Sequence, residues 1–108
     1  MVRKKLLIIR NNVFEELDEQ LNYFINNDSA EYALRFANDF VQQLQGILPH
    51  YRSFPECRYL LTKKRTYRNI VWGNYWIIYK ITPHAIEVLS LFHTKRNPSR
   101  LSRLRRLK

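Results

Sequence analysis

The fold of this chain is decided by residues 69–104, which read NIVWGNYWIIYKITPHAIEVLSLFHTKRNPSRLSRL. Two runs within this stretch, Tyr75–Ile81 and Ala85–Phe92, are rich in β-branched and aromatic residues, which favours strands. The Thr82–His84 segment between them contains a proline that pre-sets a turn dihedral, so the two runs are expected to form a hairpin. Both faces of each run are largely apolar, which is typical of inner strands covered on both sides.

Basic side chains gather where this hairpin ends. His93, Lys95 and Arg96 come at or directly after the end of the second strand, and no Asp or Glu occurs beyond Glu87. A buried hairpin with such an end presents positive charge at one edge of a sheet. The pattern therefore indicates an anionic or acidic partner.

Length and composition predict one domain, residues 1–108, with a single core. The apolar fraction of 45%, with 14% aromatic residues, excludes a disordered chain. No apolar run reaches the roughly 20 residues of a membrane span, and the apolar part of Met1–Ile9 is too short for a signal peptide. The single cysteine, Cys57, excludes an internal disulfide and fits a reducing cytoplasm.

Charge is divided unevenly along the chain. Residues 1–50 carry a net charge of −2 and residues 51–108 carry +12, which together give the net charge of +10. Such asymmetry indicates a basic functional face. The partners that it favours are a nucleic acid, a ribonucleoprotein or an acidic protein segment, and a membrane surface is disfavoured because the cations interleave with strands.

Two helices are predicted between a first strand at Lys5–Ile9 and a second strand within Thr66–Trp72. The first helix is expected to be capped by Asn12, with Glu15 at the third position. The second helix is expected to be capped by Asp28 or Ser29, with Glu31 completing a capping box after Asp28, and to end at Pro49. The apolar stripes of both helices lie at helical spacing. They consist of Val13, Leu17, Leu21, Phe24 and Ile25 in the first helix, and Ala33, Ala37, Phe40, Leu44 and Leu48 in the second.

The predicted fold class is α+β, with an antiparallel sheet and an N-terminal helical hairpin packed on one face, in the order β-α-α-β-β-β. A basic segment beginning at Pro98 has leucines at 101, 104 and 107, which predicts a short C-terminal amphipathic helix.

This element order and these sequence fragments resemble the RelE/ParE superfamily of bacterial toxins from type II toxin–antitoxin modules, which are also known as plasmid-stabilisation proteins. The fragments cover nearly the whole chain, and the strand with Tyr75 and Tyr79 followed by Phe92, His93 and Arg96 is the most specific. The others are Ala33–Phe36 with Phe40, Phe54–Glu56, Gly73–Ile81 and Ile86–Pro98. The resemblance implies a cytoplasmic bacterial toxin that arrests growth and is neutralised by a cognate antitoxin protein encoded beside it.

The superfamily has two activities on one fold. RelE-like members cut messenger RNA on the ribosome, and ParE-like members inhibit DNA gyrase. The ribonuclease branch commonly has an arginine where this chain has Trp76 and often a tyrosine after the final strand, whereas no tyrosine follows Tyr79 here. These differences favour the gyrase function. The alternative is a ribosome-dependent mRNA endoribonuclease, with His93, Arg96 and Arg68 as its catalytic candidates, and the second alternative is a non-toxic basic binding module.

Target-binding or RNA-binding residues are expected among the cations of the second half of the chain. Four precede or begin the second strand, and several of them are expected to lie beside His93 and Arg96. The solvated edge of a sheet is an equally good interpretation of these four. The candidates are Lys63, Lys64, Arg65, Arg68, Lys95, Arg96, Arg100 and Arg103, joined in the gyrase interpretation by Arg105 and Arg106.

Other candidate chemistry is weak. Cys57 has no basic neighbour in sequence and is expected to be inert. No histidine or cysteine spacing fits a metal site, no glycine-rich loop fits a nucleotide, and no cofactor is expected. An antitoxin helix is expected to dock on apolar surface at Phe24, Tyr32 and Phe36, or along the sheet edge from Lys63 to Arg68.

Overall fold

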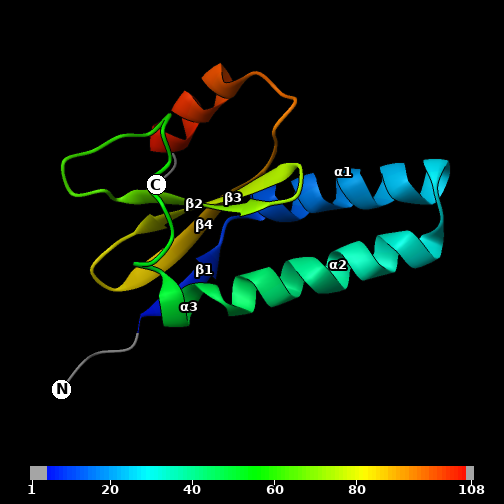
Figure 1. The fold of residues 1–108 in the computed structure, drawn as a ribbon, viewed down its shortest axis with the longest axis horizontal. Coiled ribbons are helices and arrows are strands. Elements are labelled where there is room, and N and C mark those ends of the chain that lie inside the picture. The colour runs from blue at the N-terminus through cyan, green and yellow to red at the C-terminus, as the bar shows by residue number, and fades with distance from the viewer. Residues whose placement is uncertain (1–4, 107–108) are drawn as a thin grey trace.

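The computed structural model describes residues 5–106 and shows a four-stranded sheet with a helical hairpin on one face (Figure 1). The elements, in chain order, are β1 (Leu6–Ile9), α1 (Asn11–Asn27), α2 (Ala30–Gln45), the single-turn α3 (Ile47–His50), β2 (Tyr67–Trp72), β3 (Tyr75–Ile81), β4 (Ala85–His93) and the 3-10 helix η1 (Pro98–Arg106). The predicted α+β class and element order are confirmed.

The strands lie in the order β1-β4-β3-β2, so the two strands of the predicted hairpin, β3 and β4, are the inner ones. β2, β3 and β4 pair antiparallel as expected, whereas β1 pairs parallel with β4, which makes the sheet mixed. Tertiary contacts set the direction in which β1 pairs, because a four-residue run carries no sequence signal for parallel or antiparallel pairing.

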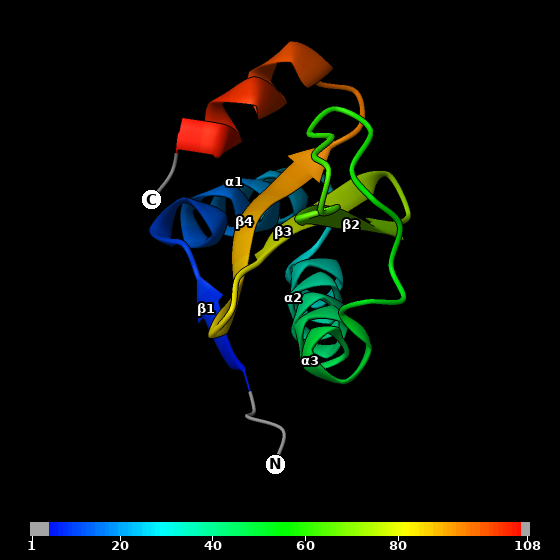
Figure 2. The same ribbon diagram turned by 90° about the vertical axis from the view of Figure 1, so that its left-hand side faces the viewer.

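Two apolar cores lie on opposite faces of the sheet. On the helix face, Ile77 and Tyr79 of β3 and Val88 of β4 pack against the buried stripe of α2. The loop before β2 and η1 lie over the other face of the sheet (Figure 2). Ile78 and Phe92 are buried in the cluster on that face. The second cover explains why both faces of the hairpin are apolar in sequence.

The helix boundaries depart from the sequence expectations in three places. Arg10, not Asn12, is the N-cap residue of α1, and it makes no side-chain cap hydrogen bond. Ser29, one of the two predicted caps of α2, is confirmed, since its side chain accepts a hydrogen bond from the backbone N–H of Tyr32, but the capping box from Asp28 is not formed. α2 ends at Gln45, and Pro49 lies inside α3, where an early helical position tolerates the missing N–H.

The predicted C-terminal helix is present as η1, which buries Leu101 and Leu104 and leaves Arg100 and Arg103 exposed. Leu107 and the side chain of Arg106 lie outside the described part of the chain. Within residues 5–106, no helix is long and apolar enough to cross a membrane.

Candidate functional site

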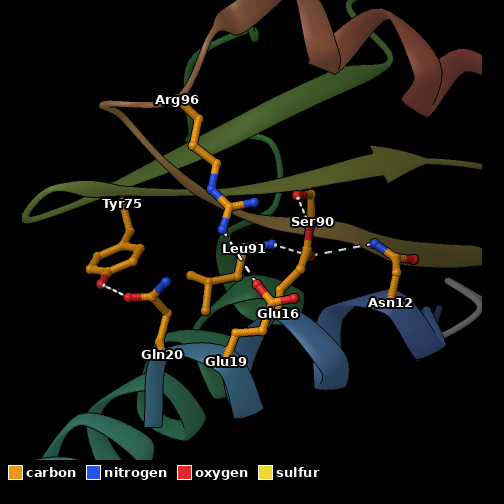
Figure 3. Close-up of polar contacts among 8 residues, drawn as sticks. All are labelled: Asn12, Glu16, Glu19, Gln20, Tyr75, Ser90, Leu91 and Arg96. Carbon is orange, nitrogen blue, oxygen red and sulfur yellow. Dashed lines mark hydrogen bonds and ion pairs between the residues drawn. The ribbon is translucent and has the colours of Figure 1, made fainter. Parts of the chain in front are cut away.

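Three polar side chains of α1 hold this helix against the second half of β4 and the start of β3. β1 ends at Ile9, so within residues 5–106 the edge of β4 beyond that point has no neighbouring strand. Asn12 Nδ2 donates to the carbonyl of Leu89 at 2.7 Å. The N–H of Leu91 donates to the Glu16 carboxylate at 3.0 Å (Figure 3). These side chains supply the hydrogen bonds that a fifth strand would otherwise make.

One turn further along α1, Gln20 Oε1 accepts a hydrogen bond from the hydroxyl of Tyr75 at 2.5 Å (Figure 3). Glu16 also accepts a hydrogen bond from the hydroxyl of Ser90 at 3.0 Å. Burial raises the pKa of the Glu16 carboxyl above its ordinary value, although these hydrogen bonds and the charge of Arg96 act in the opposite direction. Glu16 is therefore a partly buried carboxyl held between the helix and the sheet.

Replacing Glu16 by alanine is expected to lower the free energy of unfolding by about 2 kcal/mol, because the N–H of Leu91 and the hydroxyl of Ser90 lose their acceptor. Glu16→Gln keeps one acceptor for Leu91 and is expected to stay within about 1 kcal/mol of the parent at neutral pH. Glu15→Ala, on the exposed side of the same helix, is the control and should change stability by less than about 0.5 kcal/mol.

The raised pKa of Glu16 also gives this prediction a pH dependence. A carboxyl with a higher pKa in the folded state binds its proton more tightly after folding, so stability falls as pH rises from the ordinary carboxyl range through the raised value. Glu16→Gln should remove that part of the slope in urea unfolding measured across acidic to neutral pH. An unchanged slope would show that Glu16 titrates alike in both states.

Basic side chains form the exposed end of the sheet next to Asn12, Glu16 and Gln20 of α1. Lys95 and Arg96 lie in the turn after β4, and Arg100 and Arg103 lie on η1. Arg96 Nη2 contacts Glu19 Oε2 at 3.3 Å, and both side chains are exposed (Figure 3). Because a solvent-exposed ion pair contributes little free energy, Arg96 remains available to a partner. We call these four residues the basic end.

His93 closes β4 beside the basic end. Its ring meets that of Tyr75 edge to face at 4.9 Å, and its Nδ1 accepts a hydrogen bond from the N–H of Lys95 at 3.1 Å. Burial and the charges of Lys95 and Arg96 lower the pKa of His93, so the neutral imidazole is favoured at neutral pH. The ring therefore orders the turn that carries the basic end.

Two hollows border the basic end. The first, which we call the tail groove, has a volume of about 330 Å³ and lies between α1, β4 and η1. The second has about 570 Å³ and lies where the tip of the helical hairpin meets the β2–β3 turn, with His93, Lys95 and Tyr32 among its lining residues.

The cations before β2 lie at the other end of the sheet, so the expectation that they adjoin His93 and Arg96 is wrong. Arg68 pairs with Tyr79 of β3, whereas His93 of β4 pairs with Tyr75. Four residues of a strand separate the two positions by roughly 13 Å. Lys63, Lys64 and Arg65 are exposed in the loop that precedes β2. Arg68 Nε donates to the carbonyl of Arg65, so this loop lies at the same end of the sheet as Arg68. Two successive antiparallel pairings put the start of β2 and the end of β4 at opposite ends of the sheet whatever the register, so strand direction explains the error.

Arg68 is held by its own loop. Its Nε donates to the carbonyl of Arg65 at 2.9 Å, and its Nη1 donates to the carbonyls of Arg52 at 2.9 Å and Phe54 at 2.8 Å. Three carbonyl oxygens of the segment before β2 thus surround the guanidinium. This arrangement indicates a structural role for Arg68.

Trp76, at the position where the ribonuclease branch commonly has an arginine, is stacked between Tyr59 at 5.7 Å and Phe92 at 5.8 Å on the face covered by η1. Cys57 is fully buried nearby, and burial raises the pKa of its thiol, which agrees with an inert cysteine. No group of three metal-ligating side chains occurs among residues 5–106.

The expected antitoxin surface on the helices needs correction. Phe24 and Phe36 are buried and pack against each other at 4.9 Å, with Phe36 also contacting Trp72. Only Tyr32 of the three expected residues is exposed, at 42%, together with Tyr23 at 57%. The sheet-edge alternative is partly covered, because Glu56 bridges to Arg68 on the outer side of β2.

Sequence reasoning missed the polar column on α1. Asn12, Glu16 and Gln20 recur every four residues beside the apolar stripe that includes Val13 and Leu17. That spacing places the three on one helix face at the margin of the core, which is the signal that could have found them.

The geometry defines a small α+β domain with one strongly basic end, and a solved structure shares this fold. A chain of the "Chromosomal ParDE TA system from P. aeruginosa" matches with a TM-score of 0.72 at 14% sequence identity, over 85% of this chain and 98% of that chain. The comparison with curated proteins gave no match.

The family model described as "ParE toxin of type II toxin-antitoxin system, parDE" matches residues 7–98. The chain therefore belongs to the ParE family of toxins from type II toxin–antitoxin systems. The resemblance stated from the sequence is thereby confirmed, and most of η1 lies beyond the matched residues.

Proposed function

We propose that this ParE-family toxin arrests growth by binding DNA gyrase through its basic end, acts in the cytoplasm, and is neutralised by a cognate antitoxin. The observation that carries the proposal is the placement of Lys95, Arg96, Arg100 and Arg103 at one exposed end of the sheet, away from Arg68. Charges at an exposed rim speed the encounter with an oppositely charged partner and orient it.

The separation of the expected ribonuclease residues supports this choice over mRNA cleavage. Cleavage by this chain would need His93 as the proton carrier with Arg96 and Arg68 on the phosphate, and Arg68 lies roughly 13 Å along the sheet with its guanidinium bonded to loop carbonyls. Trp76, which stands where the ribonuclease branch commonly has an arginine, is stacked between Tyr59 and Phe92. Proton transfer and charge stabilisation would thus rest on Lys95, Arg96 and His93 alone.

Two assays separate the candidate functions. We expect the purified chain to inhibit supercoiling by gyrase and to leave ribosome-bound mRNA intact in primer-extension mapping. Codon-phased cleavage with unaffected supercoiling would replace our proposal with the ribonuclease function, and His93→Ala and Arg96→Ala would then be the first variants to test. Normal growth on induction of the folded protein would instead favour a non-toxic binding module.

A further inference from the structure

The tail groove is built by a segment that extends beyond the residues matched by the family model. That match ends at residue 98, and η1 covers Pro98–Arg106. Leu101 and Leu104 anchor η1 over Phe92, and these three apolar side chains line the groove together with Asn12 and Glu16 of α1. The groove is thus a feature added to the matched part of the fold.

Arginines form the outer wall of this groove. A 3-10 helix has three residues per turn, so Arg100 and Arg103 stand in line on one side of η1, about 6 Å apart at roughly 2 Å of rise per residue. Both side chains are exposed, and neither makes an ion pair with another residue of the described range. Arg96 completes the wall at the end nearest β4.

We propose that the tail groove is the docking site for an acidic amphipathic helix of the cognate antitoxin, an inference that rests on the proposed function. Carboxylates four residues apart on an α-helix are separated by about 6 Å along its axis, which matches the spacing of Arg100 and Arg103. Apolar side chains next to them would lie on Phe92, Leu101 and Leu104. One helix would thus contact both the arginine wall and the apolar floor of the groove.

The mixed lining of the groove favours such a helix over a phosphate backbone. The floor residues Phe92, Leu101 and Leu104 are already buried, so a phosphate backbone is disfavoured because it would bring negative charge close to Glu16. The helix can place its carboxylates at the arginine wall, away from Glu16, while an apolar residue faces the floor.

Occupation of the tail groove has a consequence for neutralisation. The arginines of its wall belong to the basic end that we assign to gyrase, so a bound antitoxin helix would cover the target-binding surface directly. Because η1 lies largely beyond the matched residues, the groove would also let the toxin distinguish its own antitoxin from others.

A fluorescence anisotropy titration tests the chemistry of the groove. The probe is a labelled synthetic helical peptide with two glutamates four residues apart and a leucine beside each. The double variant Arg100→Glu/Arg103→Glu is expected to bind it about tenfold more weakly at low salt, with a smaller difference at high salt. Lys63→Glu/Lys64→Glu carries the same charge change in the loop before β2, where neither lysine lines the tail groove, and should bind like the parent.

The same variants are then titrated with the purified antitoxin encoded beside this chain, to test the assigned partner. Weaker binding of Arg100→Glu/Arg103→Glu but not of Lys63→Glu/Lys64→Glu is the expected result. Equal antitoxin binding by both variants would place the antitoxin elsewhere, and a peptide with glutamines that binds as tightly as the glutamate peptide would also overturn the proposal. Neither readout uses gyrase, so a failure of the gyrase proposal would be seen separately in the supercoiling assay.

Discussion

Reversing the charges of Lys95 and Arg96 together is expected to raise the toxin concentration needed for half-inhibition of gyrase supercoiling roughly a hundredfold at low salt. Both side chains are exposed in the turn after β4, and the double reversal lowers the net charge of the basic end by four. The loss should come mainly from slower association, since exposed rim charges steer the encounter more than they hold the complex.

The control is the double reversal of Lys63 and Lys64, which changes the net charge equally in the loop before β2. It should leave inhibition within about threefold of the parent at the same salt concentration, because screening limits the reach of exposed charges to about 10 Å. Equal losses in both variants would show that total charge, rather than the basic end, governs binding. Retention of the native circular dichroism spectrum and melting temperature would exclude unfolding as the cause.

The two inner strands of the sheet were predictable from sequence because their residue composition alone favours strands. Tyr75–Ile81 was predicted with its observed bounds, and Ala85–Phe92 differs from β4 by one residue, because continuous β-branched and aromatic runs have few alternatives. The cap at Ser29 was also predictable, since a side-chain acceptor before a helical stripe is local chemistry.

Placement of the candidate site was less predictable because it depends on contacts between distant segments. Arg68 was expected beside His93 from the sheet order, but two successive antiparallel pairings put the start of β2 and the end of β4 at opposite ends of the sheet. Asn12 has the residue type and position of a helix cap, yet its amide is used by Leu89, which lies 77 residues away in the chain. The hydrogen bond from Asn12 to a distant strand carbonyl thus replaces the helix cap that its residue type favours locally.

Arg68 gives the largest stability change that we expect at a candidate site residue. Arg68→Ala should lower the free energy of unfolding by about 3 kcal/mol, because three loop carbonyls lose a charged donor and bonds to charged groups are the stronger kind. The loop it holds covers the second core, where Cys57 and Leu60 are fully buried. Urea unfolding followed by tryptophan fluorescence measures the change, since Trp76 packs on that face.

Two further variants separate a structural Arg68 from a target-binding one. Arg68→Lys keeps the charge but has no planar fork to reach carbonyls in three directions, so it should recover less than half of the lost stability. Lys63→Ala, exposed in the same loop, should change stability by less than about 0.5 kcal/mol. A structural arginine predicts that growth arrest falls with stability in Arg68→Ala and returns at lower temperature, where the loop refolds. Native stability with complete loss of toxicity would instead make its guanidinium part of the target-binding surface, and the hydrogen bonds to Arg52 and Phe54 would then be contacts that the target displaces.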